Sequence, residues 1–303
     1  MLTQWGEKLD KDNVLPEYPR PQMRRTSFIN LNGLWDYAFT AAGEKQPDKW
    51  DGKILVPFSP ECELSGVGRV LSPDEYLWYR RDWAKPDFAE GDRVILHFGA
   101  VDQSCTVYIN GLRAFRHRGG YLPFEFDATG FLSKDVNEIS LSVRDVSDTS
   151  YHSRGKQRLK RGGIWYTPQS GIWQTVWAEC IPHDCIRQLH ITPDFDKACV
   201  NVRADTVGDS RAYAVFDGRQ YQLPASIPVP DFEPWSPENP KLYDFTVTCG
   251  EDRVESYFAM RKFSVEADSE GVKRLFLNGR PYFHNGLLDQ GYWSDGMYTA
   301  PSD

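Results

Sequence analysis

Four residues near the C-terminal end combine side chains that can bind a sugar. Asp289, Gln290, Tyr292 and Trp293 place an acid, an amide and two aromatic rings close together in the sequence. Acid and amide groups hydrogen-bond hydroxyl groups, and an aromatic ring can stack on the apolar face of a sugar ring. A plain polar loop can have the same composition, so the role of these residues depends on the elements that hold them.

A second group of candidate residues lies in the loop YHSRGKQRLKRGGIWYTPQSG, at 151–171, where cations are followed by Trp165 and Tyr166. Cations beside aromatic rings suit nucleic acid or an acidic sugar, but a run of this kind is usually a solvated loop. A third hypothesis is that the loop contacts a further domain or borders the entrance for substrate. The cations are Arg154, Lys156, Arg158, Lys160 and Arg161.

Other kinds of chemistry find little support in the sequence. The net charge of −8 argues against a nucleic-acid-binding surface, which needs basic patches. There is no HExxH pair and no GxSxG nucleophile turn, and the glycine pairs at 119–120 and 162–163 lack the Lys and helix of a phosphate loop. His97 alternates with apolar residues, which favours a structural histidine in a strand. We therefore predict no metal, no cofactor and no catalytic residue within this chain.

The cysteines and the N-terminus predict a cytoplasmic protein. The opening residues, MLTQWGEKLD, have neither the basic start nor the apolar run of a secretion signal. No apolar run approaches the ~18 residues of a membrane helix. The cysteines form no CxxC pair, so we expect reduced thiols in the cores rather than a zinc site or disulfides. They are Cys62, Cys105, Cys180, Cys185, Cys199 and Cys249.

Alternation of apolar and polar residues with a period of two runs through the chain, whereas helical periodicity is nearly absent. In EISLSVR, Ile139, Leu141 and Val143 alternate with polar residues, which puts one face of a strand in a core and the other in water. LYDFTVTC, at 242–249, repeats the pattern. Further strands are expected at 31–39, 77–83, 93–98, 105–109, 172–179, 186–192, 198–204 and 253–260.

Turn residues support an all-β fold made of two sandwiches. Asn110-Gly111 and Asp217-Gly218 each lie between two apolar segments, and both dipeptides favour the positive φ angles of a tight hairpin. Many short strands at this spacing are typical of jelly rolls and related sandwiches. Composition changes predict a first domain at 1–182, an immunoglobulin-like sandwich at 183–267 and a remnant at 268–303 that is too short for a core of its own.

Several motifs, in order along the chain, resemble glycoside hydrolase family 2, the family of β-galactosidases, β-glucuronidases and β-mannosidases. The first four resemble its sugar-binding jelly roll, the fifth its immunoglobulin-like domain and the last the start of its TIM barrel. The resemblance covers the chain from about residue 20 onward. The motifs are FINLNGLWDYAF (28–39), EYLWYRRDW (75–83), VDQSCTVYINGLRAFRHRGGYLPFEFDAT (101–129), SGIWQTVWAE (170–179), WSPENPKLY (235–243) and LFLNGRPYFHNGLLDQGYW (275–293).

The resemblance implies that the catalytic centre lies outside the chain. A TIM barrel needs about 250 residues, and the family uses two glutamates on late barrel strands, neither of which has a counterpart here. YFHNGLL would be the first barrel strand, so Asp289, Gln290, Tyr292 and Trp293 would face the substrate. The familiar β-galactosidases have a His- and Glu-rich stretch where this chain has LDQGYW. Asn137-Glu138 reproduces the dipeptide of the family acid/base but begins a first-domain strand, which favours a structural role.

We therefore predict the N-terminal, non-catalytic part of a β-galactosidase-like hydrolase of terminal β-linked sugars, with β-glucuronidase as the next most favoured activity. Its expected partners are the missing barrel, a β-linked glycoside and, as an option, a second copy of itself, but neither nucleic acid nor a membrane. The alternative is a stand-alone carbohydrate-binding sandwich; a structural module is the third option. Without a barrel to cover them, residues beyond about 290 are expected to be poorly ordered or held by another chain.

Overall fold

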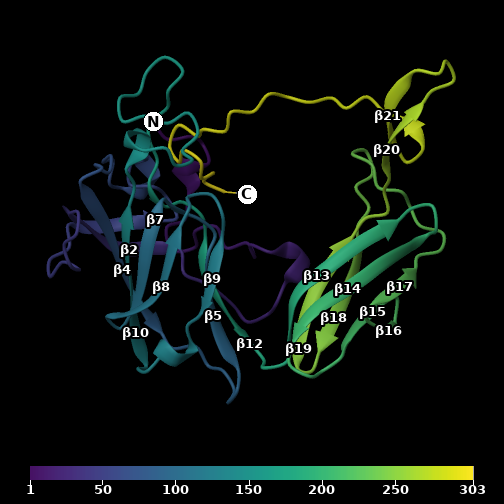
Figure 1. The fold of residues 1–303 in the computed structure, drawn as a ribbon, viewed down its shortest axis with the longest axis horizontal. Helices are drawn as coiled ribbons and strands as arrows, with labels where there is room; N and C mark the ends of the chain where they lie inside the picture. Colours follow the sequence, from purple (N-terminus) through teal and green to yellow (C-terminus); the bar gives the residue numbers. More distant parts are fainter. Residues whose placement is uncertain (303) are drawn as a thin grey trace. The chain divides into compact units, whose positions relative to one another are not determined.

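The computed structural model describes residues 1–302, which form two compact units (Figure 1). The first unit consists of residues 1–19, 27–180 and the segment from 290 onward. The second consists of 20–26 and 181–289. Each unit therefore contains a segment that is distant in sequence from the rest of it. The domain ranges 1–182, 183–267 and 268–303 stay a prediction about the protein's evolutionary modules.

The first unit is a sandwich of antiparallel strands. One sheet has the order β1-β12-β5-β9 and the other the order β3-β2-β4-β10-β7-β8, with the short pair β11-β6 beside them. The strands are β1 (Phe28–Asn30), β2 (Gly33–Ala41), β3 (Gly52–Val56), β4 (Glu75–Ala84), β5 (Arg93–Phe98), β6 (Val101–Asp102), β7 (Ser104–Ile109), β8 (Leu112–Arg118), β9 (Phe124–Asp127), β10 (Val136–Arg144), β11 (Gly171–Ile172) and β12 (Val176–Ile181).

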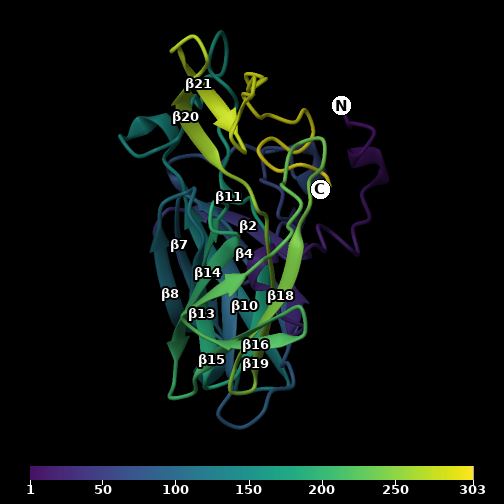
Figure 2. The same cartoon turned by 90° about the vertical axis from the view of Figure 1, so that its right-hand side faces the viewer.

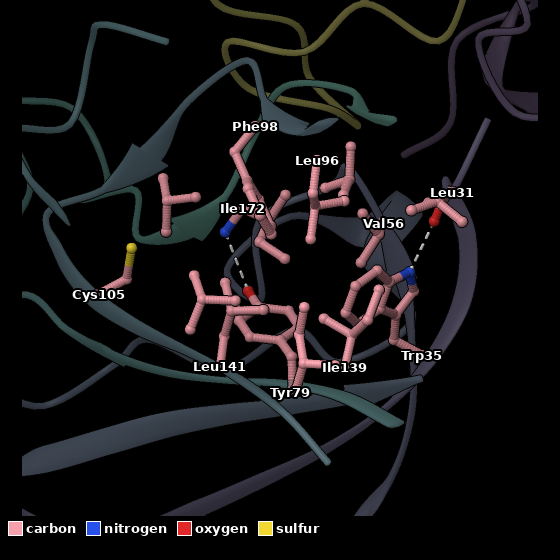
Figure 3. Close-up of a cluster of buried hydrophobic side chains, with 14 of the residues drawn as sticks. Leu31, Trp35, Val56, Tyr79, Leu96, Phe98, Cys105, Ile139, Leu141 and Ile172 are labelled. Atoms are coloured by element: carbon pink, nitrogen blue, oxygen red, sulfur yellow. Dashed lines mark hydrogen bonds between the residues drawn. The ribbon is translucent and has the colours of Figure 1, made fainter. Parts of the chain in front are cut away.

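Alternating side chains from both sheets meet in one core (Figure 3). Ile139 and Leu141 of β10 are fully buried, as the alternation predicts. Large aromatic residues fill the layer, and their polar atoms find partners. The Trp35 indole donates a hydrogen bond to the Leu31 carbonyl (2.9 Å), as Figure 3 shows. A buried polar atom without such a partner would cost about 1–3 kcal/mol, so these bonds fix the orientation of the rings.

The second unit has sheets of order β13-β14-β17 and β16-β15-β18-β19, with a small third sheet, β20-β21-β22. Its own core lies between the first two sheets and includes Val200, Val202, Val247 and Phe258. Figure 2 shows β20 and β21 as a hairpin of this unit. The strands are β13 (Cys185–Asp194), β14 (Cys199–Val207), β15 (Ala212–Phe216), β16 (Arg219–Gln222), β17 (Ala225–Pro228), β18 (Tyr243–Cys249), β19 (Asp252–Phe258), β20 (Phe263–Ala267), β21 (Lys273–Leu277) and β22 (Arg280–Pro281).

Both predicted hairpin turns are present. Asn110 and Gly111 have φ angles of 53° and 77° between β7 and β8. Asp217 and Gly218 have φ angles of 49° and 71° between β15 and β16. The all-β prediction of two sandwiches is confirmed. The helices of the described residues are the short 3-10 turns η1 (Gly6–Lys8), η2 (Pro21–Met23), η3 (Glu63–Ser65), η4 (Thr129–Phe131) and η5 (Ser147–Thr149). None of these could cross a membrane.

One expected element differs from the structure. YFHNGLL, predicted as a barrel strand, has no strand pairing and follows β22 as an extended segment. Phe283, Leu287 and Leu288 are more than four-fifths exposed. The Tyr282 amide donates a hydrogen bond to the Leu275 carbonyl of β21 (3.0 Å), but the strand pairing does not continue beyond it, and a strand needs a series of such bonds with a neighbour. The preceding segment LFLNGRPY contains the end of β21, which pairs with β20, and β22, which pairs with β21.

Candidate functional site

The four predicted sugar-binding residues fall into two places. Asp289 is exposed and belongs to the second unit. Gln290, Tyr292 and Trp293 belong to the first unit. Gln290 contacts Tyr166, and Tyr292 and Trp293 line a groove that is described next. The structure therefore brings together three of the four residues, and the substrate role of all four stays a prediction.

An open groove of about 960 Å³ lies on the first unit. Three segments form it: the loop before β4 (61–70), the end of the loop at 151–171, called the basic loop below, and the C-terminal segment from 290 onward. Its volume is in the range of sites for small ligands. The residues that line it are Glu61, Cys62, Glu63, Gly68, Val70, Leu159, Arg161, Gly162, Trp165, Tyr166, Thr167, Pro168, Tyr292, Trp293, Ser294 and Met297.

Aromatic rings form one wall of this groove. Tyr166 stacks on Tyr292 with ring centroids 4.9 Å apart and an interplanar angle of 19°. The Tyr166 hydroxyl donates a hydrogen bond to Gln290 Oε1 (2.8 Å), and the Tyr292 hydroxyl donates to the Thr167 carbonyl (2.7 Å). The rings are thus held by their polar ends. Trp293 is 36% exposed and so has ring surface available for contact with a ligand.

The basic loop is folded onto the first unit rather than being fully solvated. The Arg158 guanidinium lies 3.7 Å above the Trp165 ring, a close cation–π contact. Gln157 is buried; its Oε1 accepts a hydrogen bond from the Gln169 amide (2.6 Å). Arg161 lines the groove and donates to Thr167 Oγ1 (3.3 Å). The loop therefore borders the groove. Whether it contacts a further domain or a substrate entrance, as the third hypothesis has it, stays a prediction.

Glu61 is a groove residue that sequence reasoning missed. Its Oε1 accepts hydrogen bonds from Ser170 Oγ (2.6 Å) and the Leu71 amide (3.2 Å), and its Oε2 accepts one from the Ser170 amide (3.1 Å). Burial raises the pKa of Glu61 to about 8, against the opposing effect of these donors. The carboxyl group thus ties the loop before β4 to the start of β11. Its segment, SPECELSG, has no periodicity that could have identified it.

Gly171, at the start of β11, packs directly against the core. Its φ angle is +75°, and a Cβ atom at this position would overlap the hydroxyl oxygen of Tyr79. That hydroxyl accepts a hydrogen bond from the Ile172 amide (3.2 Å; Figure 3). Only glycine meets both requirements without strain, so the turn that leads from the groove wall into the core depends on this residue.

The C-terminal segment is packed on the first unit, contrary to the expectation that residues beyond 290 lack contacts within the chain. Thr299 Oγ1 donates a hydrogen bond to the Trp173 carbonyl (2.6 Å), and the Tyr298 amide donates to Gln169 Oε1 (3.0 Å). Met297 joins a small apolar cluster with Leu64 and other residues. Composition alone did not indicate this docking because the contacts join residues that are more than 100 positions apart.

One interacting pair of acids among the described residues, Asp102 and Asp145, does not have the arrangement of a glycosidase centre. A retaining enzyme holds two carboxyl groups ~5 Å apart on either side of the glycosidic bond, with the substrate between them. Asp102 and Asp145 interact, but both are at least 95% buried and neither lines the groove. Burial and the nearby Asp145 raise the pKa of Asp102 to about 8. Such an enclosed pair leaves no space for a sugar.

Two other candidates have structural roles, as the sequence predicted. Asn137 is fully buried, accepts a hydrogen bond from Asn110 Nδ2 (2.8 Å) and fixes the turn before β10. Glu138 accepts a bond from Gln46 Nε2 (3.0 Å). His97 is buried in β5 and stacks on Trp177 with centroids 3.7 Å apart.

Comparisons with known proteins agree with this architecture. Residues 69–177 match the family model "Glycosyl hydrolases family 2, sugar binding domain", and residues 208–261 match the model "Glycosyl hydrolases family 2". The two matches, in this order, show two domains that occur in series in multidomain proteins of this family. The chain belongs to glycoside hydrolase family 2 and aligns with the N-terminal region of its β-galactosidases and β-glucuronidases.

Individual relatives are distant and longer than this chain. A β-galactosidase of Thermoanaerobacter pseudethanolicus is 23% identical over 86% of the chain and 38% of the relative. A β-glucuronidase of Sus scrofa is 23% identical over 90% of the chain and 49% of the relative. The solved β-glucuronidase of Faecalibacterium prausnitzii has a TM-score of 0.73 at 22% identity and covers 94% of the chain and 53% of that structure, a likeness of fold. The chain thus spans about half, or less, of these proteins.

Proposed function

We propose that this chain is the non-catalytic N-terminal part of a β-galactosidase-like enzyme that hydrolyses terminal β-linked sugars by double displacement. In that enzyme the acid/base and nucleophile come from a barrel domain outside these residues, and the two sandwiches support that domain. The observation that carries the proposal is the family match of both units in series.

Within this proposal, the groove of the first unit borders the substrate site. Gln290 hydrogen-bonds sugar hydroxyls, and Tyr292 and Trp293 provide apolar ring surface for the sugar or its aglycone. Asp289 is a further hydroxyl ligand, supplied from the segment just before them. The aromatic wall and its volume of about 960 Å³ support this assignment, since sugar sites commonly combine ring surfaces with a few polar groups.

The substrate is proposed to be a β-galactoside, with a β-glucuronide as the second choice, because relatives of both names align with the chain. We further propose a cytoplasmic location, which is supported by six cysteines that are all free thiols in the structure. Association with a second copy is compatible with the exposed apolar side chains of Phe283, Leu287 and Leu288.

The decisive experiment uses residues 1–303 alone. Assays with nitrophenyl β-galactoside and nitrophenyl β-glucuronide are expected to show no turnover above a blank. Turnover by this chain would contradict the proposal. The same groove is contained within one unit, which favours, as a second candidate, a stand-alone carbohydrate-binding protein.

Binding measurements separate the two candidates. The glycosidase proposal expects weak, millimolar binding of simple glycosides, because the barrel walls of the pocket are not part of the chain. Micromolar binding on a glycan array by residues 1–303 would favour the stand-alone protein. Trp293→Ala should abolish either kind of binding, and the matched control Trp50→Ala, whose ring packs on Arg80 away from the groove lining, should leave it unchanged.

A further inference from the structure

Residues near the N-terminus clamp the turn that carries the exposed ring of the groove. We propose that Thr3 and Asp295 are positioning residues that hold Trp293 at the groove of the first unit. The inference rests on the proposed function for its consequence on sugar binding, but its structural part can be tested separately. No sequence motif joins these positions, which lie at opposite ends of the chain.

The clamp centres on the carboxylate of Asp295, which is fully buried. Its Oδ2 accepts two hydrogen bonds from Thr3, one from the backbone amide and one from Oγ1, each of 2.7 Å. Oδ1 has no hydrogen-bond partner among the described residues. Thr3 therefore supplies both of the hydrogen bonds that the Asp295 side chain accepts from the described residues.

The N-terminal side of the clamp is also fixed. Thr3 Oγ1 accepts a hydrogen bond from the Gly6 amide (3.0 Å), so the hydroxyl both donates and accepts. A Cβ atom at position 6 would overlap the Asp295 carboxylate. A larger residue at position 6 would therefore have to displace the Asp295 carboxyl group, so the two segments fit closely.

Asp295 transmits this restraint to the groove through a short turn. Trp293 and Met297 exchange two backbone hydrogen bonds of 2.8 and 3.0 Å, which places Asp295 at the tip between them. The Asp295 carbonyl accepts a hydrogen bond from the Leu64 amide (3.0 Å). The rings of Trp293 and Trp5 pack in a T-shaped arrangement, with centroids 5.6 Å apart and planes at 82°. Trp293 is therefore fixed at both its backbone and its ring.

A sugar contact needs this precision because ring stacking depends on the position and tilt of the aromatic plane. Without the Thr3 bonds, the turn at 293–297 keeps its two backbone bonds and its contact with Leu64 but loses its hydrogen bonds to the N-terminal segment. Trp293 then samples several orientations. Ligand binding must fix one of them, and the entropy lost in doing so weakens the affinity. The expected effect is weaker binding of the same glycosides, with no change in the fold of either sheet.

The test uses the 303-residue chain labelled with 5-fluorotryptophan. The fluorine resonance of Trp293 is assigned by its loss in Trp293→Phe. Thr3→Val removes the hydroxyl and keeps the shape, whereas Thr3→Ser restores the hydroxyl. Thr129→Val is the matched control: Thr129 Oγ1 also donates to a carboxylate, Asp127 Oδ1 (2.6 Å), and does not line the groove. Methyl β-galactoside and methyl β-glucuronide are titrated into each variant.

Thr3→Val is expected to shift or broaden the Trp293 resonance and to weaken glycoside binding about fivefold, while Thr3→Ser and Thr129→Val match the unsubstituted chain. An unchanged Trp293 resonance in Thr3→Val overturns the positioning role. If neither glycoside binds but Thr3→Val still moves the resonance, the positioning role is supported and the sugar assignment of the groove fails. Should Thr3→Val not fold, Thr3→Ala also removes the hydroxyl and must shift the Trp293 resonance relative to Thr3→Ser.

Discussion

At the scale of single residues, the structure contains ionisable groups whose burial should be visible in the pH dependence of stability. Asp102 is 2% exposed and its Oδ1 has no hydrogen-bond partner among the described residues. Its surroundings include Asp145, Glu61 and the Tyr121 hydroxyl. Burial, followed by repulsion from Asp145, raises the pKa of Asp102 from its usual value of 3.8 to about 8.

The sign of the effect follows from proton binding. Between pH ~4 and ~8 the folded protein keeps the Asp102 proton and the unfolded chain releases it, so the free energy of unfolding falls as the pH rises. The maximum slope from one such group is about 1.4 kcal/mol per pH unit. In Asp102→Asn the free energy of unfolding should fall less steeply with pH. Part of the fall should remain, because burial also raises the pKa of Glu61 to about 8. Urea unfolding at pH 5, 6, 7 and 8, followed by tryptophan fluorescence, measures both slopes; equal slopes would contradict the prediction.

Tryptophan fluorescence suits this measurement because of where the rings lie. Trp235 is the tryptophan of the second unit, and the other nine belong to the first. The signal therefore reports mainly on the unit that contains Asp102.

At the scale of elements, the short pair β6-β11 connects the groove wall to the core, and it depends on Gly171. We expect Gly171→Ala to destabilise the first unit by about 3 kcal/mol, from a left-handed φ angle and a clash with the Tyr79 hydroxyl. Gly111→Ala is the matched control, since Gly111 has a φ angle of +77° but no atom within 4 Å of the added Cβ. It should cost about 1 kcal/mol.

Chemical denaturation of both variants gives the comparison. Both substitutions strain the backbone at a positive φ angle, but only Gly171→Ala overlaps the Tyr79 hydroxyl. The prediction is wrong if both lower the free energy of unfolding by the same amount. Tyr79→Phe in the Gly171→Ala background should recover part of the loss, since it removes the overlapping oxygen.

Elements also show what the sequence could and could not predict. Alternation placed β7, β18 and β19 close to their observed bounds because one face of each strand is more buried than the other. The bounds expected for β4, β5, β10 and β14 are also close, although these strands contain consecutive buried residues. Asn-Gly and Asp-Gly located two hairpins because these residues tolerate positive φ. YFHNGLL failed as a strand because its apolar residues indicate burial, whereas a strand also requires a pairing partner.

The groove was less predictable for a related reason. Gln290, Tyr292 and Trp293 could be proposed from their side-chain types and a family resemblance. Glu61 and Thr3 could not, because their roles depend on contacts with Ser170 and Asp295, which are distant in sequence. The pattern of residues within a segment predicts strands and turns. It does not predict which polar residues from distant segments will pair.

At the scale of the whole molecule, each unit has its own core and should respond separately to damage. In the second unit the buried pair Arg25–Asp252 has Nε–Oδ1 and Nη2–Oδ2 distances of 2.8 and 2.9 Å. Arg25→Met leaves the carboxylate buried without its cation, which we expect to cost about 3–5 kcal/mol. The double variant Arg25→Met/Asp252→Leu should recover part of this, though Ile186 loses partners for its backbone groups.

Hydrogen exchange followed by mass spectrometry checks this prediction unit by unit. In Arg25→Met the amides of β14 and β18 should lose protection, while those of β5 and β7 should keep it. Equal loss in both sets would show that the two cores unfold together, in conflict with separate stability.

The docking of residues 290–302 on the first unit has a consequence for the order in which the nascent protein matures. The ribosome must add residues 181–289 before the clamp on Thr3 can form. At translation rates of about 5–20 residues per second, the jelly roll waits on the order of ten seconds, with its aromatic wall incomplete, while its neighbour is being synthesised. Cutting the gene at codon 181 would likewise yield a sandwich that lacks the turn bearing Trp293, so a dissection that keeps the groove intact has to retain both modules.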